Sequence, residues 1–234
     1  MESLENVIRY PTERENWVQT VLIGGVLMFL GVFLVPLIAV YGYLMETIRG
    51  SLDGEAGPPA FDDWGALLTD GVQAAVILFV FMLIPIIVAA ITIGRVLRSV
   101  VVALAPGGRP EIAAAGAVAF GFVVSGLLAL AFGYVAVAAI VNFARAEEFG
   151  AAFDVTTLRR VLVHRDYAVA WLVSAVLLIA VGLVSSIPAI GWLLAPFASF
   201  YALVVAANLW ADGFSAALGL EERPGDVSDR EPAI

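Results

Sequence analysis

Long stretches without any charged residue dominate the hydrophobic pattern of this chain. Four of them are 30, 24, 33 and 45 residues long, and they cover residues 16–45, 71–94, 112–144 and 167–211. A helix needs roughly 20 apolar residues to cross the hydrocarbon core of a bilayer, so each stretch is long enough to span it. The pattern therefore predicts an all-α fold, a polytopic transmembrane helix bundle.

Turn-forming residues divide these stretches into five predicted spans. The longest stretch separates at Ser185-Ser186-Ile187-Pro188, whereas 112–144 carries no strong turn signal and is expected to form one long helix. Pro36 lies inside the first span and predicts a kink there. A polar tail over 220–234 is expected to be disordered. The expected transmembrane domain covers 17–219, with spans at about 17–45, 71–105, 112–144, 167–186 and 189–212.

Shorter amphipathic segments flank the predicted spans. The N-terminal segment, 1–16, contains a short amphipathic helix, and segments 61–70 and 153–165 have the pattern of interfacial elbows that lead into a span. Both elbows open on the tripeptide Ala-Phe-Asp, which indicates either a span–elbow–span repeat or a coincidence of three residues. Asp62 and Asp154 are expected to cap the two elbows.

Composition narrows the class of protein and its environment. The chain is 62% hydrophobic with a mean hydropathy of +0.98, and its net charge is −9, with 12 arginines and no lysine. Such a composition is typical of cells with molar internal salt, although a GC-rich genome that replaces lysine codons is the alternative. The negative charge argues against nucleic acid as a partner. The lack of cysteine and the single histidine exclude disulfides, thiolate metal sites and His-rich metal sites.

Few polar residues within the spans could form a site. Asn208 and Asp212 lie one helical turn apart on the last span, and they form either a small polar site or an interhelical hydrogen bond beside an interfacial carboxylate. Arg159, Arg160 and Arg165 belong to the most basic patch, which serves either contact with anionic lipid or topological anchoring. The sequence carries no catalytic constellation, so we expect no catalytic residue, no cofactor and no metal.

Several short motifs lie at the ends of the predicted spans and between them: Arg9-Tyr10-Pro11, Gly24-Gly25, Tyr41-Gly42-Tyr43, Pro58-Pro59-Ala60-Phe61-Asp62-Asp63-Trp64, Asp70-Gly71, and the segment from Arg145 through Ala152-Phe153-Asp154 to Trp171. Together they resemble an uncharacterised membrane protein family, domain of unknown function 4013, which is found mainly in halophilic archaea. The resemblance covers about residues 1–215. It implies a membrane protein of halophiles and no chemistry. From the predicted spans we expect a multi-pass protein of the plasma membrane.

Three functions stay open. Because no ionisable residue lies in the middle of a span, the leading hypothesis is a non-enzymatic scaffold, assembly factor or envelope partner. The alternative is a passive transporter or channel for small or lipidic solutes, in which Pro36, Pro85 and Pro188 break helices around a midplane site. An intramembrane enzyme is the third. The expected partners are the lipid bilayer and either another membrane protein or a second copy of the chain.

Arginine counts give a weak indication of orientation. In a five-span protein, seven arginines lie on the face that carries the elbows and five lie on the opposite face. Positive residues are enriched in cytoplasmic loops, so this difference favours elbows in the cytoplasm.

Overall fold

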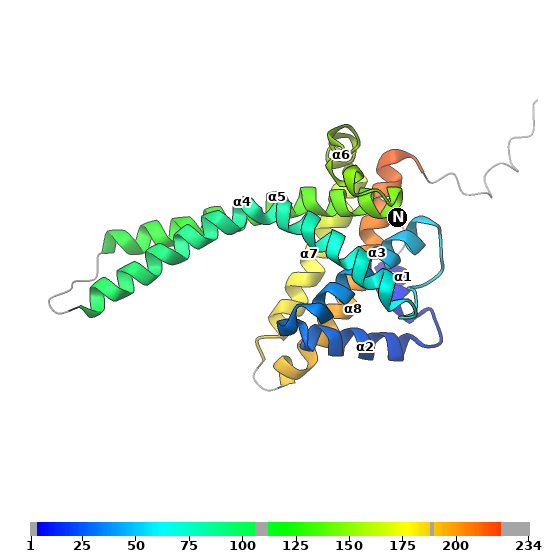
Figure 1. Cartoon of the computed structure of the whole chain (residues 1–234), viewed down its shortest axis with the longest axis horizontal. Coiled ribbons are helices and arrows are strands. Elements are labelled where there is room, and N and C mark those ends of the chain that lie inside the picture. The colour runs from blue at the N-terminus through cyan, green and yellow to red at the C-terminus, as the bar shows by residue number, and fades with distance from the viewer. Residues whose placement is uncertain (1–3, 106–111, 188–189, 221–234) are drawn as a thin grey trace, which may run out of the picture. The chain divides into compact units, whose positions relative to one another are not determined.

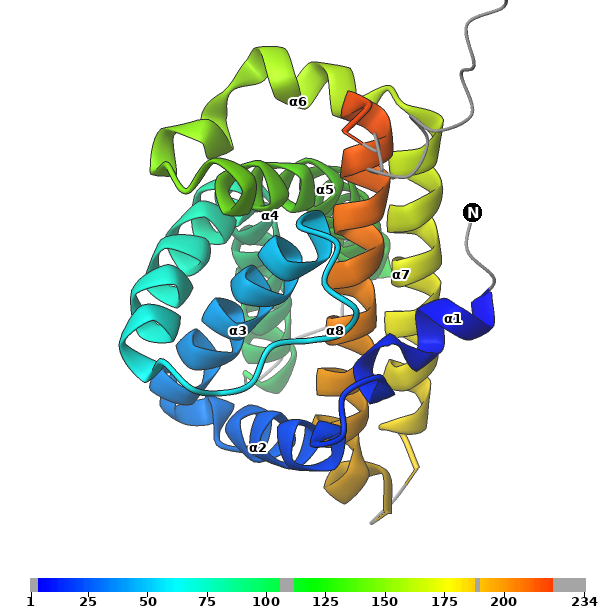
Figure 2. The same ribbon diagram turned by 90° about the vertical axis from the view of Figure 1, so that its right-hand side faces the viewer.

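Helices form all the regular structure in the part of the chain that is described. The computed structural model describes residues 4–105, 112–187 and 190–220, and these contain no strand, which confirms the all-α fold (Figures 1 and 2). The 3₁₀ turns are η1 (Tyr10–Thr12), η2 (Gly31–Phe33) and η3 (Phe149–Phe153). The α-helices are α1 (Leu4–Arg9), α2 (Trp17–Phe29), α3 (Val35–Leu52), α4 (Trp64–Leu104), α5 (Ile112–Ala146), α6 (Val155–Leu162), α7 (Arg165–Val184) and α8 (Ile190–Leu218).

Four of the described helices are long and apolar enough to cross a membrane, rather than the five predicted. They cover Trp64–Leu104, Gly116–Ala146, Arg165–Leu183 and Gly191–Leu218. The stretch 112–144 lies within one continuous helix, α5. By the length and composition of these helices, the protein is an integral membrane protein.

The predicted span over 17–45 is wrong as a single helix. It is divided into α2, η2 and α3, and α2 has only 13 residues. At the junction, Leu34 has a φ of 55°, outside the right-handed helical region. Pro36 does not kink a continuous helix but lies in the first turn of α3, where its missing N–H group has no helical acceptor in any case.

The two predicted elbows take different structures. The second contains a separate helix, α6, which ends before α7 begins at Arg165. The first is wrong as a separate element, because residues from Trp64 onward form the beginning of α4 and continue without a break. The structural reason concerns Asp70, the charged residue at the end of the predicted elbow. Its carboxylate is paired with Arg49, so the helix can continue through this position without a break. Residues 106–111, which lie between the second and third predicted spans, are outside the described residues, as are Pro188 and all of the predicted tail except Leu220.

Contacts divide the chain into two compact units. The first comprises Met1–Ala75 and Ala138–Ile234, and the second is Val76–Val137. In the first unit, α7 and α8 pack side by side, and α2 and α3 pack against α8 on the side away from α7 (Figure 2). Its largest fully buried side chains are aromatic: Tyr43, Tyr167, Phe143, Phe200 and Phe214.

Two glycines permit a close crossing of α3 with the first turns of α4. A Cβ atom placed on Gly42 would lie 2.6 Å from the carbonyl carbon of Leu67, and one on Gly71 would lie 2.8 Å from the carbonyl carbon of Ile38. Each glycine therefore faces the backbone of the other helix. Any larger residue at either position would force the helices apart.

The second unit consists of the facing parts of α4 and α5. Gly121 on α5 lies against Thr92 on α4, where an added Cβ would be 2.6 Å from the Thr92 Oγ1. Thr92 and Ser125 are buried, and each hydroxyl donates to a carbonyl one turn earlier in its own helix, at 2.9 and 2.8 Å. The outer faces of both helices carry exposed apolar side chains, as lipid contact requires.

Candidate functional site

Asn208 and Asp212 belong to a chain of hydrogen bonds that joins three parts of the sequence. On α8, the Asn208 Nδ2 donates to the Asp212 Oδ2 at 3.3 Å. The Ser51 hydroxyl, in the last turn of α3, donates to the Asn208 Oδ1 at 3.1 Å, and the Tyr10 hydroxyl lies 3.1 Å from the Ser51 Oγ. Because Ser51 has one proton and gives it to Asn208, Tyr10 is the donor of the remaining bond.

Two of the four side chains in this chain of hydrogen bonds, Tyr10 and Asn208, are buried, and Ser51 and Asp212 are partly exposed. Asn208 is only 7% exposed, and α8 packs against both α3 and η1 at this point. Burial is also the main cause that raises the pKa of Tyr10, which the bond to Ser51 and the nearby Arg14 partly offset. The phenol is therefore protonated at neutral pH and is a donor. The Ser51–Asn208 bond is a hydrogen bond between α3 and α8.

A second polar cluster surrounds Arg49 near the end of α3. Its guanidinium forms an ion pair with Asp70 on α4, and its Nε donates to the carbonyl of Ala144 on α5 at 3.3 Å. The Glu147 carboxylate lies 3.9 Å from the same Nε but is largely exposed, so it contributes little. Arg49 thus ties together the ends of three helices within the first unit.

Glu46, one turn before Arg49, is a half-buried carboxylate. Burial raises its pKa, the positive charge of Arg49 lowers it, and the acidic residues nearby raise it further. Its proton is therefore held more tightly in the folded protein than in the unfolded chain.

The proline-rich loop before α4 is fixed to α3 by aromatic side chains. The buried Tyr43 hydroxyl donates to the carbonyl of Pro59 at 2.9 Å, and its ring stacks on Phe61 with a centroid distance of 4.2 Å. Phe61 in turn stacks on Trp64 at 5.7 Å. The loop and the start of α4 therefore form one packed layer over α3.

Aspartates cap both segments that were predicted as elbows, but not always at the expected position. Asp154 is the N-cap of α6, and its Oδ1 accepts from the Thr156 amide at 3.0 Å. At the start of α4 the cap is Asp63, whose Oδ1 accepts from the Ala66 amide at 3.0 Å, so the prediction of Asp62 is wrong by one residue. The helix begins at Trp64, and the residue directly before it is in the capping position.

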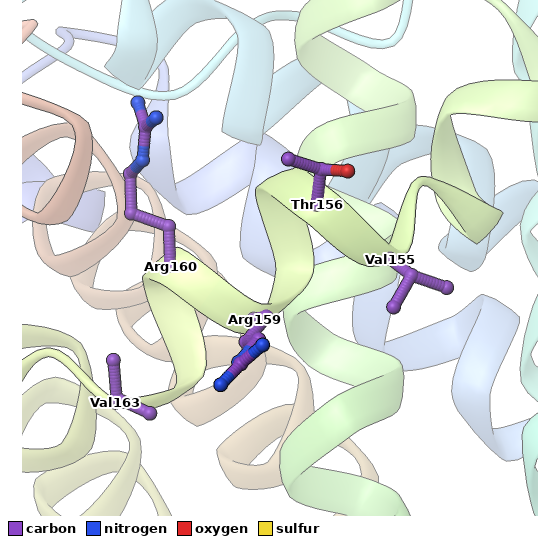
Figure 3. Close-up of a pocket in the computed structure, with 5 residues that line it drawn as sticks. All are labelled: Val155, Thr156, Arg159, Arg160 and Val163. Carbon is purple, nitrogen blue, oxygen red and sulfur yellow. The ribbon is translucent and has the colours of Figure 1, made fainter.

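The predicted basic patch lies on the outer face of α6 and at the start of α7. Arg159 and Arg160 line a shallow hollow of about 390 Å³ together with Val155, Thr156 and Val163. Figure 3 shows that the two guanidinium groups point in different directions, so they do not form a single anion cradle. Arg165 is exposed in the first turn of α7. Two arginines between exposed valines are typical of a helix that lies at a membrane surface.

Other kinds of site are not found within the described residues. In this part of the chain no three His, Cys, Asp or Glu side chains come together as ligands for a metal ion. Every buried side-chain nitrogen or oxygen there has a hydrogen-bond partner.

The sequence alone did not identify Ser51, Tyr10 and Arg49 as parts of these clusters. Ser51 is separated from Asn208 by 157 positions, and no local pattern links them. A signal did exist for Arg49, since it lies four residues after the end of the uncharged stretch 16–45, where a charged side chain close to the membrane needs a partner.

Comparison with known proteins gives a family and no activity. Residues 25–190 match the family described as protein of unknown function, DUF4013. No curated protein and no solved structure matches the chain. The match covers well over half of the sequence and includes most of the motifs that meet around α3 and the start of α4. The chain therefore belongs to the DUF4013 family, whose function is unknown.

Proposed function

We propose that this protein is a non-enzymatic scaffold or assembly partner in the plasma membrane of a halophilic archaeon. The observation that carries the proposal is the burial of Asn208, which together with Asp212 is the best candidate for a solute or catalytic site. Asn208 is 7% exposed, and its amide is bonded to Ser51 and Asp212. A transport or catalytic site would need access for water or substrate at these groups.

The source and the membrane rest on the composition and on the family resemblance. A lysine-free chain with a net charge of −9 suits a cell with concentrated internal salt. In an archaeon of this kind, we place a multi-pass protein with these long apolar helices in the plasma membrane.

The part of the protein that would bind a partner is the second unit. At 1.5 Å per residue, its parts of α4 and α5, residues 76–104 and 112–137, are about 44 and about 39 Å long, against a hydrocarbon core of about 30 Å. Within this unit, α4 exposes apolar side chains from Val76 to Leu104, and α5 exposes them from Phe120 to Leu130. A partner's transmembrane helix can pack on them in the same way as α4 and α5 pack on each other.

The first test is purification of the tagged full chain from native membranes, crosslinked at the salt concentration of the cell. We expect a partner in stoichiometric amount. Leu97→Trp on α4 adds bulk to the proposed surface, and Leu172→Trp on α7 is the matched control, because the two leucines are 62% and 58% exposed. The partner should be recovered with the wild type and with Leu172→Trp, and it should be reduced several-fold with Leu97→Trp.

Two outcomes would contradict the proposal in different ways. Recovery of the protein alone, together with solute or lipid flux in proteoliposomes above that of empty liposomes, would replace the scaffold by a passive transporter. A partner that binds all three versions equally would keep the scaffold and would exclude the Leu97 region of α4 as its contact surface.

A further inference from the structure

The two ends of the segment from α2 to α3 lie beside each other. Before α2, the Arg14 guanidinium is paired with the Glu55 carboxylate after α3 at 2.8 Å. The Tyr10 hydroxyl is also bonded to Ser51 in the last turn of α3. A segment that crossed the membrane once would separate its ends by the core thickness of about 30 Å. These contacts show that the chain returns to the place where it started.

Neither arm of this segment is long enough to cross the membrane by itself. Helix α2 has 13 residues and is about 20 Å long. The apolar part of α3, Val35–Met45, is about 16 Å long and is followed by Glu46. Both lengths are well below the thickness of the hydrocarbon core.

The corner between the two arms is apolar and strongly exposed. Val32, Phe33 and Leu34 are 83%, 69% and 68% exposed, and no polar side chain lies between Leu30 and Val35. The amides of Phe33 and Leu34 donate to the carbonyls of Leu30 and Gly31 at 3.0 and 3.1 Å. Backbone groups in lipid need such internal partners, and the 3₁₀ turn supplies them.

We infer that α2, η2 and α3 form a re-entrant hairpin whose corner contacts lipid acyl chains and whose two ends lie on the same face of the membrane. Crossings by α4, α5, α7 and α8 then place the N-terminal segment, the loop before α4, α6 and the end of α8 on one face. Contacts within the first unit agree with this arrangement, since Arg49 binds the end of α5 and Ser51 binds α8 near its end.

The hairpin also gives a clearer prediction of the orientation of the protein in the membrane than the five-span arrangement does. Among the described residues, the face of the hairpin ends carries seven arginines and the opposite face carries two, Arg95 and Arg98. Positive residues are enriched in cytoplasmic loops, so the hairpin ends face the cytoplasm. The basic side of α6 then lies at the inner leaflet. The seven arginines are Arg9, Arg14, Arg49, Arg145, Arg159, Arg160 and Arg165.

Single cysteines test this inference directly, because the chain has none of its own. The reporters are Glu15→Cys and Asp53→Cys at the hairpin ends, Gly150→Cys near α6, Ser186→Cys at the turn after α7 and Val32→Cys at the corner, all at exposed positions. Each variant of the full chain is treated with a membrane-impermeant maleimide, first in intact cells and then after permeabilisation. Crosslinking of an Arg14→Cys/Glu55→Cys pair by a short bis-maleimide reports the closed hairpin independently of sidedness.

We expect Ser186→Cys to react in intact cells and the cysteines at Glu15, Asp53 and Gly150 to react only after permeabilisation. Val32→Cys should stay unlabelled both in intact cells and after a permeabilisation that leaves the lipid bilayer in place, because the corner lies in lipid. Reaction of Glu15→Cys and Asp53→Cys from opposite faces, or failure of the Arg14–Glu55 crosslink in well-expressed protein, would overturn the hairpin. Reaction of Val32→Cys in intact cells would show two complete crossings instead. Common labelling of both ends from outside would reverse the orientation.

Discussion

Replacing Gly42 by alanine tests the close crossing between α3 and α4. The new Cβ would lie 2.6 Å from the Leu67 carbonyl carbon, and closer still to its oxygen. Non-bonded carbon atoms pack at about 3.5–4.0 Å, so the two helices must separate by about 1 Å. The contact that opposes this movement is backbone, and a backbone carbonyl in a helix cannot rotate away as a side chain can.

Two effects of opposite sign determine the change in stability. Alanine in a helix interior is more favourable than glycine by about 0.8–1.0 kcal/mol, while overpacking a close-packed interior costs about 1–3 kcal/mol. Because the obstruction is rigid, we expect an overpacking cost of about 2–3 kcal/mol, in the upper part of that range, and therefore a net loss of about 1–2 kcal/mol. The measurement is thermal unfolding of the purified full chain in detergent. Gly126→Ala on α5 is the matched control, since nothing lies within 4 Å of its Cβ position.

The control should be more stable than the wild type, and Gly42→Ala should be less stable. If Gly42→Ala were as stable as Gly126→Ala, the close crossing of α3 and α4 would be refuted. The double variant Gly42→Ala/Gly71→Ala adds a sharper test. Once the helices have separated for the first Cβ, the second costs less, so the two losses should sum to more than the loss of the double variant.

Three further perturbations probe the other contacts. Gly121→Ala should lose less stability in the same unfolding assay than Gly42→Ala, because it meets the side chain of Thr92, which can adjust; an equal loss would contradict this. Asn208→Leu should cost about 1–3 kcal/mol, because it leaves the Ser51 hydroxyl without its acceptor; no loss of unfolding free energy would show that the hydrogen bond is not formed. Burial raises the pKa of the Glu46 carboxyl above its ordinary value of 4.5, so the stability of the wild type falls as the pH rises from 4.5 through the raised pKa. Glu46→Gln should therefore stabilise the protein at pH 7. The advantage of Glu46→Gln should vanish below pH 4.5 in unfolding measurements over a pH series, and a constant advantage would exclude titration as its cause.

The long helices could be predicted from the sequence because lipid imposes a simple requirement. A spanning helix needs about 20 consecutive apolar residues and satisfies its own backbone, so the absence of charge is a reliable signal. The predicted spans at 112–144 and 167–186 correspond to α5 and α7 with their ends displaced by a few residues. The same requirement explains why the predicted span over 17–45 was wrong.

The break between α2 and α3 could not be predicted because it carries no polar turn residue. Turns of soluble proteins are recognised by polar residues that face water. A corner that faces lipid has apolar residues instead, so this signal is absent. Only Gly31 and Pro36 mark the position, and proline within an apolar stretch is equally compatible with a kinked span. The contacts that identify the corner, between Arg14 and Glu55 and between Tyr10 and Ser51, lie 41 positions apart in each case.

The polar site was recognised in part, for a similar reason. Asn208 and Asp212 are visible because they lie one turn apart on an otherwise apolar helix. Their partners on α3 and at η1 are ordinary residues in segments that look like loop or interface. These partners determine whether a buried asparagine lines a cavity or forms a hydrogen bond between helices. They can be identified only from the tertiary structure.

The motifs on which the family resemblance rests share one physical role in the first unit, which is close packing. Gly24 and Gly25 admit the rings of Phe200 and Phe197, and Gly42 admits a backbone carbonyl. Tyr43 holds the proline-rich loop over the same helix. All of these residues fix the α2–α3 hairpin against its neighbours. A carrier that alternates between two states would have to break and remake these contacts in each cycle, and a rigid glycine crossing opposes such movement. This packing is a further reason why we propose a scaffold rather than a transporter.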